Sequence, residues 1–275
     1  MNKIVCWLFI VISGAVAARG EVPFAAGVVR DSEGGVIRGD VKAKRLALIF
    51  TGDEFGESAK PILDALKGRG VSGGFFLTGN FVRDEALRPL VTRMVEEGHY
   101  VGPHSDSHPL YAPWEDRRRS LVTADFFKED LQKNIDGLRG AGALPKGTSV
   151  LFVPPYEWYN AEQVAWSREV GVGLINFTPG SGSNRDYARE GDRVFVPSAK
   201  ILDDILAYEQ KDPHGLNGFL LLLHLGSGRR DPFHPQLGKL CDELKGRGYE
   251  FVRVDDLLLV PADKMEPQID ADERR

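Results

Sequence analysis

The sequence predicts an α/β fold in which parallel strands form a barrel and helices cover its outside. Short apolar runs alternate with segments of helical periodicity, a pattern typical of a parallel sheet flanked by helices. The run Phe219–Leu223 is apolar at every position, as expected of a strand buried on both faces. A barrel is therefore the first choice, and an open doubly wound sheet is the alternative.

Seven segments have the length and apolar content of strands, and helical patterns lie between most of them. The predicted strands cover residues 46–51, 74–78, 99–102, 149–153, 172–177, 218–224 and 250–254. The predicted helices cover residues 59–70, 85–97, 123–139, 161–170, 199–208 and 235–247. Strand and helix thus alternate through most of the chain, as a β/α barrel requires.

Local signals support two of these helices. Gly70 is a suitable stop for the first helix, because glycine commonly ends helices. Thr123 is the expected N-cap of the helix over residues 123–139. The side chains expected on the buried side of that helix are Phe126, Phe127, Leu131, Ile135 and Leu138.

The first twenty residues have the features of a secretory signal peptide. Lys3 supplies a positive start, Ile4–Ile12 is almost continuously apolar, and Ala15-Val16-Ala17 offers a cleavage site. This run is shorter than the about 20 residues that a membrane-spanning helix needs. We therefore expect cleavage, no stable membrane insertion afterwards, and a secreted or periplasmic protein; a retained anchor is the alternative.

The rest of the chain is predicted to be one domain, since α/β barrels commonly reach this length. Residues 21–44 are a polar leader in which we expect a hairpin across the bottom of the barrel. Residues 45–262 form the barrel, and residues 263–275 form a disordered tail. Cys241 is the cysteine that remains after loss of Cys6 with the signal peptide, so we expect no intramolecular disulfide.

Composition argues against one class of partner. The chain has 275 residues and a formal net charge of −5, and its lysines and arginines are spread along the sequence. A nucleic-acid-binding protein usually has a basic excess gathered on one face. We therefore expect no nucleic-acid partner.

Polar residues follow the predicted strands at the ends where barrel enzymes carry their active sites. Asp53 and Glu54 follow the first strand, and His104 and His108 follow the third. A Tyr-Glu-Trp-Tyr run follows the fourth strand, and His224 ends the sixth. These side chains should therefore meet at one mouth of the barrel.

The spacing of His104 and His108 would let one helical turn direct both imidazoles at a single ion. Asp53 and Glu54 can supply a metal ligand and a general base, and His224 at the mouth is a candidate general acid. For His104 and His108 the alternative is that both face solvent. For Asp53 and Glu54 it is a pair of acids at a helix N-terminus, and for His224 it is a buried structural histidine. His99, His214 and His234 are interpreted as structural.

Aromatic residues accompany the carboxylate after the fourth strand. Tyr156, Trp158 and Tyr159 flank Glu157 closely, and such rings commonly stack on sugar faces. Packing beneath the loop is an equal alternative. These four residues are the candidate substrate-binding group.

Three stretches of the chain resemble the polysaccharide deacetylases, the family 4 carbohydrate esterases with a NodB-type homology domain. They are Ala47–Leu66, Gly74–Asn80 and Glu97–His108, and the last contains the specific pattern His104-Ser105-x-x-His108. The resemblance covers about residues 45 to 257. It implies a distorted seven-stranded barrel and a divalent ion, usually Zn²⁺ in the family, held by Asp-His-His.

The resemblance also implies roles for individual residues. His104 and His108 match the metal histidines, and Leu222-Leu223-His224 matches the motif of the general acid. Asp53 is assigned to the ion and Glu54 to the base. In the family a water attacks an acetyl carbonyl while a carboxylate takes its proton.

The chain departs from the family at three motifs. Thr51-Gly52-Asp53-Glu54 stands in place of Thr-Phe-Asp-Asp-Gly, and Val153 replaces the arginine that orients the base. Asn176-Phe177 stands where an Asp-Trp motif is expected, and Glu157 is a third carboxylate that would replace part of the altered network. The chain thus resembles a divergent branch of the family.

The predicted function is metal-dependent removal of N- or O-acetyl groups from a polysaccharide or oligosaccharide. One alternative is a glycoside hydrolase that uses Asp53 or Glu54 with Glu157 as its carboxylate pair. The other alternative is a catalytically inactive sugar-binding relative, for which the missing arginine is the main argument.

Overall fold

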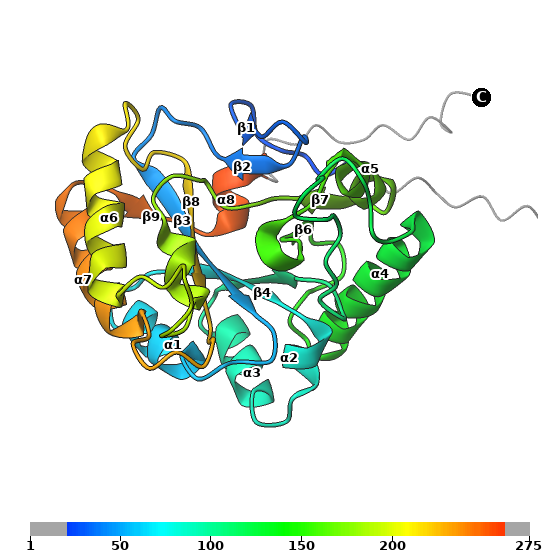
Figure 1. The fold of residues 1–275 in the computed structure, drawn as a ribbon, viewed down its shortest axis with the longest axis horizontal. Helices are drawn as coiled ribbons and strands as arrows, with labels where there is room; N and C mark the ends of the chain where they lie inside the picture. Colours follow the sequence, from blue (N-terminus) through cyan, green and yellow to red (C-terminus); the bar gives the residue numbers. More distant parts are fainter. Residues whose placement is uncertain (1–20, 262–275) are drawn as a thin grey trace, which may run out of the picture.

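The computed structural model describes residues 21–261, which form a curled sheet with helices around it (Figure 1). The predicted signal peptide, residues 1–20, and the predicted tail, residues 263–275, lie outside the described residues.

The main sheet has the strand order β1-β2-β8-β3-β4-β5, with β9 also paired to β3. Strands β6 and β7 form a separate two-stranded sheet. The strands are β1 Val29–Arg30, β2 Val36–Arg38, β3 Arg45–Gly52, β4 Gly73–Leu77, β5 Tyr100–Pro103, β6 Val150–Phe152, β7 Val172–Leu174, β8 Phe219–His224 and β9 Glu250–Phe251.

The seven predicted strands correspond to β3 through β9, and each of them pairs in parallel with another. The hairpin expected within residues 21–44 is β1 and β2, which pair antiparallel. Strand β2 also pairs antiparallel with β8 at Phe219, the amino end of that strand. The hairpin therefore lies at the end of the sheet opposite to His224.

The barrel is distorted, because β6 and β7 are attached to the main sheet by few backbone contacts. The amide of Val153 donates to the carbonyl of Pro103 beyond β5, at 3.3 Å. On the other side, Ile175 forms a parallel bridge with Val36 of β2, and the amide of Asn176 donates to Val36 at 2.8 Å. The chain thus forms a curled sheet closed by isolated contacts, and the open sheet is excluded.

Helices surround this sheet (Figure 1). They are α1 Ala59–Lys67, α2 Gly79–Arg83, α3 Arg88–Glu96, α4 Ala124–Gly140, α5 Ala161–Glu169, α6 Ser198–Lys211, α7 His234–Gly246 and α8 Val254–Leu258, with short 3-10 turns η1 Pro155–Glu157 and η2 Ser183–Tyr187. The single helix expected over residues 85–97 is shorter, because Pro89 stands in its first turn and the chain before it is not helical. The last predicted strand is also shorter, since α8 begins at Val254.

Helix α4 confirms the predicted cap and most of the predicted face. The side chain of Thr123 accepts a hydrogen bond from the amide of Phe126, and Phe127 and Leu131 are buried. Phe126 was expected on the buried face, but it is 43% exposed. It lies about 100° around the helix from Phe127, which turns its ring toward solvent.

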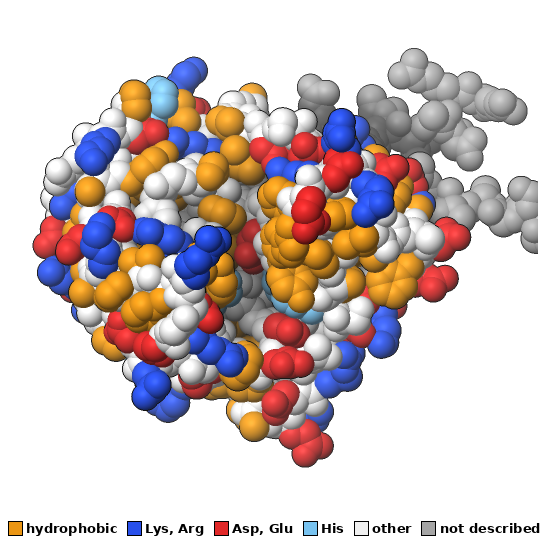
Figure 2. Space-filling view, in the orientation of Figure 1, with side chains coloured by type: hydrophobic (Ala, Val, Ile, Leu, Met, Phe, Trp, Pro, Cys, Tyr) orange, Lys and Arg blue, Asp and Glu red, His pale blue; other side chains and the backbone are white. Residues whose placement is uncertain are grey.

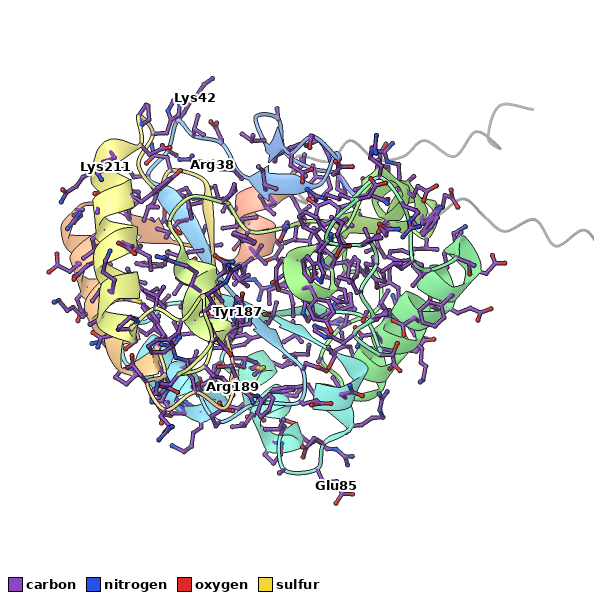
Figure 3. The ribbon with its side chains drawn as sticks, viewed as in Figure 1. Arg38, Lys42, Glu85, Tyr187, Arg189 and Lys211 are labelled. Atoms are coloured by element: carbon purple, nitrogen blue, oxygen red, sulfur yellow. The ribbon has the colours of Figure 1, made fainter. Side chains whose placement is uncertain are left out.

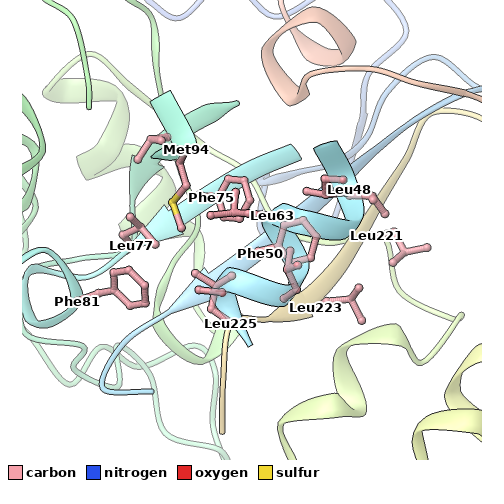
Figure 4. Packing of buried hydrophobic residues seen from close by; sticks show 14 of the residues in the cluster. Leu48, Phe50, Leu63, Phe75, Leu77, Phe81, Met94, Leu221, Leu223 and Leu225 are labelled. Atoms are coloured by element: carbon pink, nitrogen blue, oxygen red, sulfur yellow. The ribbon is translucent and has the colours of Figure 1, made fainter. Parts of the chain in front are cut away.

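Large apolar side chains fill the space between the parallel strands and the outer helices. The rings of Phe50 on β3 and Phe75 on β4 stack with centroids 5.1 Å apart. Figure 4 shows Leu63 of α1 and Met94 of α3 close to these rings. This packing holds β3 and β4 rigidly in place beneath the loops that follow them.

The one cysteine within residues 21–261 is Cys241, which is buried on α7. Burial raises the pKa of its thiol to about 12. No disulfide therefore supports the part of the chain that the structure describes. In this same part, no helix has the length and apolar character to cross a membrane.

Gly218, which precedes β8, provides a test of the hairpin contact. It has φ +68°, and a Cβ there would lie 2.5 Å from the carbonyl oxygen of Gly39. Gly218→Ala should lower the free energy of unfolding by at least about 1 kcal/mol in urea denaturation. Gly246→Ala is the matched control, because no atom lies within 4 Å of its added Cβ. Equal stability of the two variants would contradict this account.

Candidate active site

A pocket of about 680 Å³ opens at the carboxyl ends of the parallel strands. Figure 2 shows it as a hollow near the centre of the molecule, with acidic and histidine side chains inside and a hydrophobic cluster beside it. The predicted site residues that line it are Asp53, Glu54, His104, His108, Tyr156, Glu157, Trp158 and His224. Of the predicted set, Tyr159 is missing from this lining.

Asp53 is held at the floor of the pocket by the strand next to its own. Its Oδ1 accepts hydrogen bonds from Thr78 Oγ1 at 2.9 Å and from Asn80 Nδ2 at 3.1 Å. Thr78 is also the N-cap of α2, so its position is fixed by the start of that helix. One carboxylate oxygen of Asp53 is thus occupied, and Oδ2 faces His108.

His104 follows β5 and is buried. Its Nδ1 lies 2.7 Å from the carbonyl oxygen of Val153, so this nitrogen donates and Nε2 keeps a free lone pair. Burial, together with the charge of His108, holds the pKa of His104 well below its usual value. A neutral imidazole with one nitrogen fixed by a carbonyl is the form that binds metal ions.

The loop from His104 to His108 is not the helical turn that the spacing predicted. Ser105 and His108 have φ values of 70° and 53°, in the left-handed region. The amide of His108 donates to Ser105 Oγ at 2.9 Å, and Asp130 on α4 accepts from the amides of Asp106 and Ser107. The turn nevertheless brings the two imidazole rings to a centroid separation of 5.1 Å.

The predicted metal ligands fit an ion in their chemistry but are not gathered tightly. Asp53 Oδ2 lies 3.6 Å from His108 Nδ1, which is too long for a hydrogen bond. This separation is close to the about 3.4 Å expected for two ligands of one tetrahedral zinc ion. Within residues 21–261, however, no three His, Cys, Asp or Glu side chains surround a common point. The Asp53-His104-His108 site therefore stays a prediction.

His224 is paired with a carboxylate that the sequence analysis did not identify. Asp186 accepts from His224 Nδ1 at 2.7 Å through Oδ1 and from the backbone amide of His224 at 2.9 Å through Oδ2. Burial lowers the pKa of His224, but the charge and hydrogen bond of Asp186 and the charge of Glu157 together outweigh burial, so that this pKa is raised overall. The pair favours the imidazolium form, which can donate a proton into the pocket.

Two carboxylates remain as possible bases, and their surroundings differ. Glu54 follows Asp53 directly and is exposed at the mouth. Glu157 ends η1 and is partly buried in the pocket, and burial raises its pKa to about 7. Its carboxylate has no hydrogen-bond or ion-pair partner among the described residues.

An aromatic rim borders one side of the pocket. Trp114 is 56% exposed, and its ring centroid lies 5.5 Å from that of Trp158 and 6.0 Å from that of Tyr156. Tyr156 also packs on His108, with centroids 4.5 Å apart. Tyr159 takes no part in this rim, because it is fully buried and donates its hydroxyl hydrogen to Asp31 at 2.8 Å.

The opposite side of the pocket comes from η2 and the loops near it. Figure 3 labels Tyr187 and Arg189, which line the pocket from this side. The guanidinium of Arg189 lies 4.8 Å from the ring centroid of Phe55, and Tyr187 packs on His224. Sequence reasoning missed these residues and Asp186, because η2 has no periodic apolar pattern. Trp114 was also missed, although a tryptophan in a long polar loop was an available signal.

Replacing Asp186 by asparagine should lower the pKa of His224, since a neutral amide removes the charge that favours the imidazolium. NMR titration of the His224 ring measures this shift directly. Asp203→Asn, an exposed substitution on α6, should leave the titration unchanged. An unaltered pKa in Asp186→Asn would show that the contact does not control the charge of His224.

Sequence comparison finds relatives over most of the chain. The chain is 28% identical over 222 residues to the peptidoglycan-N-acetylmuramic acid deacetylase PdaA of Bacillus subtilis, covering 80% of this chain and 73% of that protein. It is 30% identical over 216 residues to a peptidoglycan-N-acetylglucosamine deacetylase of Bacillus cereus, covering 78% and 68% of the two chains.

Solved structures share the fold at lower identity. Bacillus subtilis PdaA, a family 4 carbohydrate esterase, aligns with a TM-score of 0.64 at 24% identity, covering 81% of this chain and 84% of that one. BA3943 of Bacillus anthracis, described as a pseudoenzyme of the same family, aligns with a TM-score of 0.64 at 22% identity, covering 82% and 69%. The profile of the family "Polysaccharide deacetylase" matches residues 38–175, which is half of the chain. The chain therefore belongs to the polysaccharide deacetylase family, the family 4 carbohydrate esterases.

Proposed function

We propose that this protein removes acetyl groups from a polysaccharide or oligosaccharide by metal-dependent hydrolysis. The observation that carries the proposal is the pairing of His224 with Asp186 in the same pocket as Asp53, His104 and His108. A proton donor thus lies beside side chains of the types that hold a catalytic ion. Membership of the family supports hydrolysis as the reaction and a polysaccharide as the substrate class.

Asp53, His104 and His108 would hold the divalent ion, with zinc as the first candidate because the set combines one carboxylate with two imidazoles. When bound, such an ion polarises the acetyl carbonyl and lowers the pKa of a water molecule. The hydrogen bonds of Asp53 to Thr78 and of His104 to Val153 orient the ligands before any ion arrives.

The protein side chains would then move the protons of the reaction. A pocket carboxylate takes one proton from the attacking water, whose oxygen forms a bond to the carbonyl carbon. The His224 imidazolium donates a proton to the departing nitrogen or oxygen as the bond to the acetyl group breaks. Asp186 keeps His224 charged and oriented with Nδ1 engaged, so that Nε2 is the donating atom.

The aromatic rim supports a sugar substrate. Trp114, Tyr156 and Trp158 present a partly exposed apolar surface next to the acid, and sugar rings stack on such surfaces. The two relatives named as peptidoglycan deacetylases make acetamido sugars of cell-wall polymers the first substrates to test. Export through the predicted signal peptide would bring the protein to polymers outside the cytoplasm.

We expect the purified protein to bind about one zinc-class ion per chain and to release acetate from acetylated sugar oligomers. His104→Ala should abolish metal binding because it removes a ligand, whereas His214→Ala, at an exposed loop position, should not. Elemental analysis measures the ion, and a chelator should stop acetate release until zinc is restored. Chain shortening that persists in the chelator would instead indicate a glycoside hydrolase.

Trp114→Ala should raise KM for an oligosaccharide about tenfold and leave kcat nearly unchanged, because it removes stacking area away from the reacting bond. Kinetics on oligomers of increasing length measure this effect, which should vanish for the shortest substrate. Phe126→Ala, which removes an exposed aromatic ring on α4, is the matched control. A loss confined to kcat would place Trp114 in the chemical step instead.

A further inference from the structure

Glu157 is an acidic side chain without a partner in a pocket where most polar groups are paired. It lines the pocket beside His224, yet no side chain or amide within residues 21–261 donates a hydrogen bond to its carboxylate. Placing a carboxylate in such a site costs free energy unless something compensates. A site that keeps this group unpaired is open to a reactant.

The backbone at Glu157 is held in a conformation that non-glycine residues rarely adopt. Tyr156 and Glu157 have consecutive φ values of 58° and 52°, both in the left-handed region. The amide of Glu157 donates to the carbonyl of Pro154 at 3.0 Å, and Asn176 Nδ2 donates to the carbonyl of Glu157 at 2.8 Å. Strain of this kind persists where the surrounding structure fixes it, and it occurs often at active sites. Here it directs the Glu157 side chain into the pocket.

The charges around Glu157 suit a proton acceptor at neutral pH. Burial raises its pKa most strongly, the positive charge of His224 lowers it, and Asp186 raises it again, with the result at about 7. A general base works best when its pKa lies near the operating pH. The other titratable groups that line this pocket are Asp53, Glu54, His104, His108, Tyr156, Tyr187, Arg189 and Asp192.

Glu54, the base that the sequence predicted, lacks these features. Its side chain is exposed at the mouth, where solvent competes for its carboxylate. Gly52, the residue before Asp53, could not be replaced by an acidic residue either, since a Cβ there would lie 2.9 Å from Leu225 and Phe81. Of Glu54 and Glu157, Glu157 is therefore the carboxylate that is partly buried in the pocket.

We propose that Glu157, and not Glu54, is the general base of the deacetylation. This inference rests on the proposed function. Glu157 takes one proton from the water whose oxygen adds to the acetyl carbon, and His224 gives one proton to the leaving atom as its bond to that carbon breaks. The proton held by Glu157 then returns to solvent or to His224, so that acetate and the free amine or hydroxyl are the products.

The test compares single variants of the full metal-loaded protein by acetate release across pH 5 to 9. Glu157→Gln should lower kcat by at least about 100-fold, the usual contribution of a general base, with little change in KM or bound zinc. The wild-type rate should rise with pH through about 7, as Glu157 loses its proton, and the residual rate of Glu157→Gln should lack this rise. Glu157→Asp, which keeps a carboxylate, should retain the rise at a reduced rate.

Two further variants serve as comparisons for the activity of Glu157→Gln. Glu54→Gln should lose much less activity than Glu157→Gln, and Glu129→Gln, on the exposed side of α4, should match the wild type. Formate should restore part of the rate of Glu157→Ala, because a small carboxylate can occupy the vacated space. Rescue would support a proton-transfer role even if Glu157→Gln were poorly folded.

The outcomes are distinct. A Glu157→Gln variant that keeps more than a tenth of the wild-type rate, or that loses its zinc, would overturn the assignment. A larger loss in Glu54→Gln than in Glu157→Gln would return the role to Glu54. If the wild-type protein binds zinc but releases no acetate from any acetylated oligomer, the proposed function fails, and the base assignment fails with it.

Discussion

The parallel register of β3 with its neighbours places the polar groups of the pocket. Gly52 of β3 pairs with Leu77 of β4, which pairs with Pro103 of β5. The next residue on each strand is therefore Asp53, Thr78 or His104, and these three lie side by side. On the other edge of β3, Thr51 pairs with His224 of β8. A shift of one residue in any of these pairings would turn a functional side chain away from the mouth.

Much of this arrangement was predictable because it follows from strand ends. A buried strand can be recognised in the sequence by its apolar residues, and the carboxyl ends of parallel strands lie at one edge of the sheet. Asp53, His104, His108 and His224 were found in this way. The side chains that the sequence analysis missed or misplaced depend on contacts that no local pattern encodes. Asp186 reaches His224 from an irregular 3-10 turn 38 residues earlier, and Tyr159 is buried by its distant partner Asp31.

The choice between Glu54 and Glu157 shows the same limit in the sequence. Adjacent to Asp53, Glu54 was the natural candidate, but adjacency along a loop does not determine which side chain points inward. The inward position of Glu157 depends on two left-handed residues and on the amide of Asn176, none of which a hydrophobic pattern reveals. The ring of Tyr156, the first of these two residues, packs on His108.

The small β6–β7 sheet has a consequence for how the pocket tolerates change. It supplies Tyr156, Glu157 and Trp158 through the turn after β6, yet it joins the main sheet by isolated backbone contacts. The two walls of the pocket therefore come from two sheets: His224 and the predicted ion ligands follow strands of the main sheet, whereas Glu157 and the aromatic residues follow β6. The hydrogen bond from His104 Nδ1 to the carbonyl of Val153 and the contact of His108 with Tyr156 tie the two walls together. A change in side-chain packing under β6 would therefore carry Glu157 and its aromatic neighbours together, and alter their distance from His224 on the other wall.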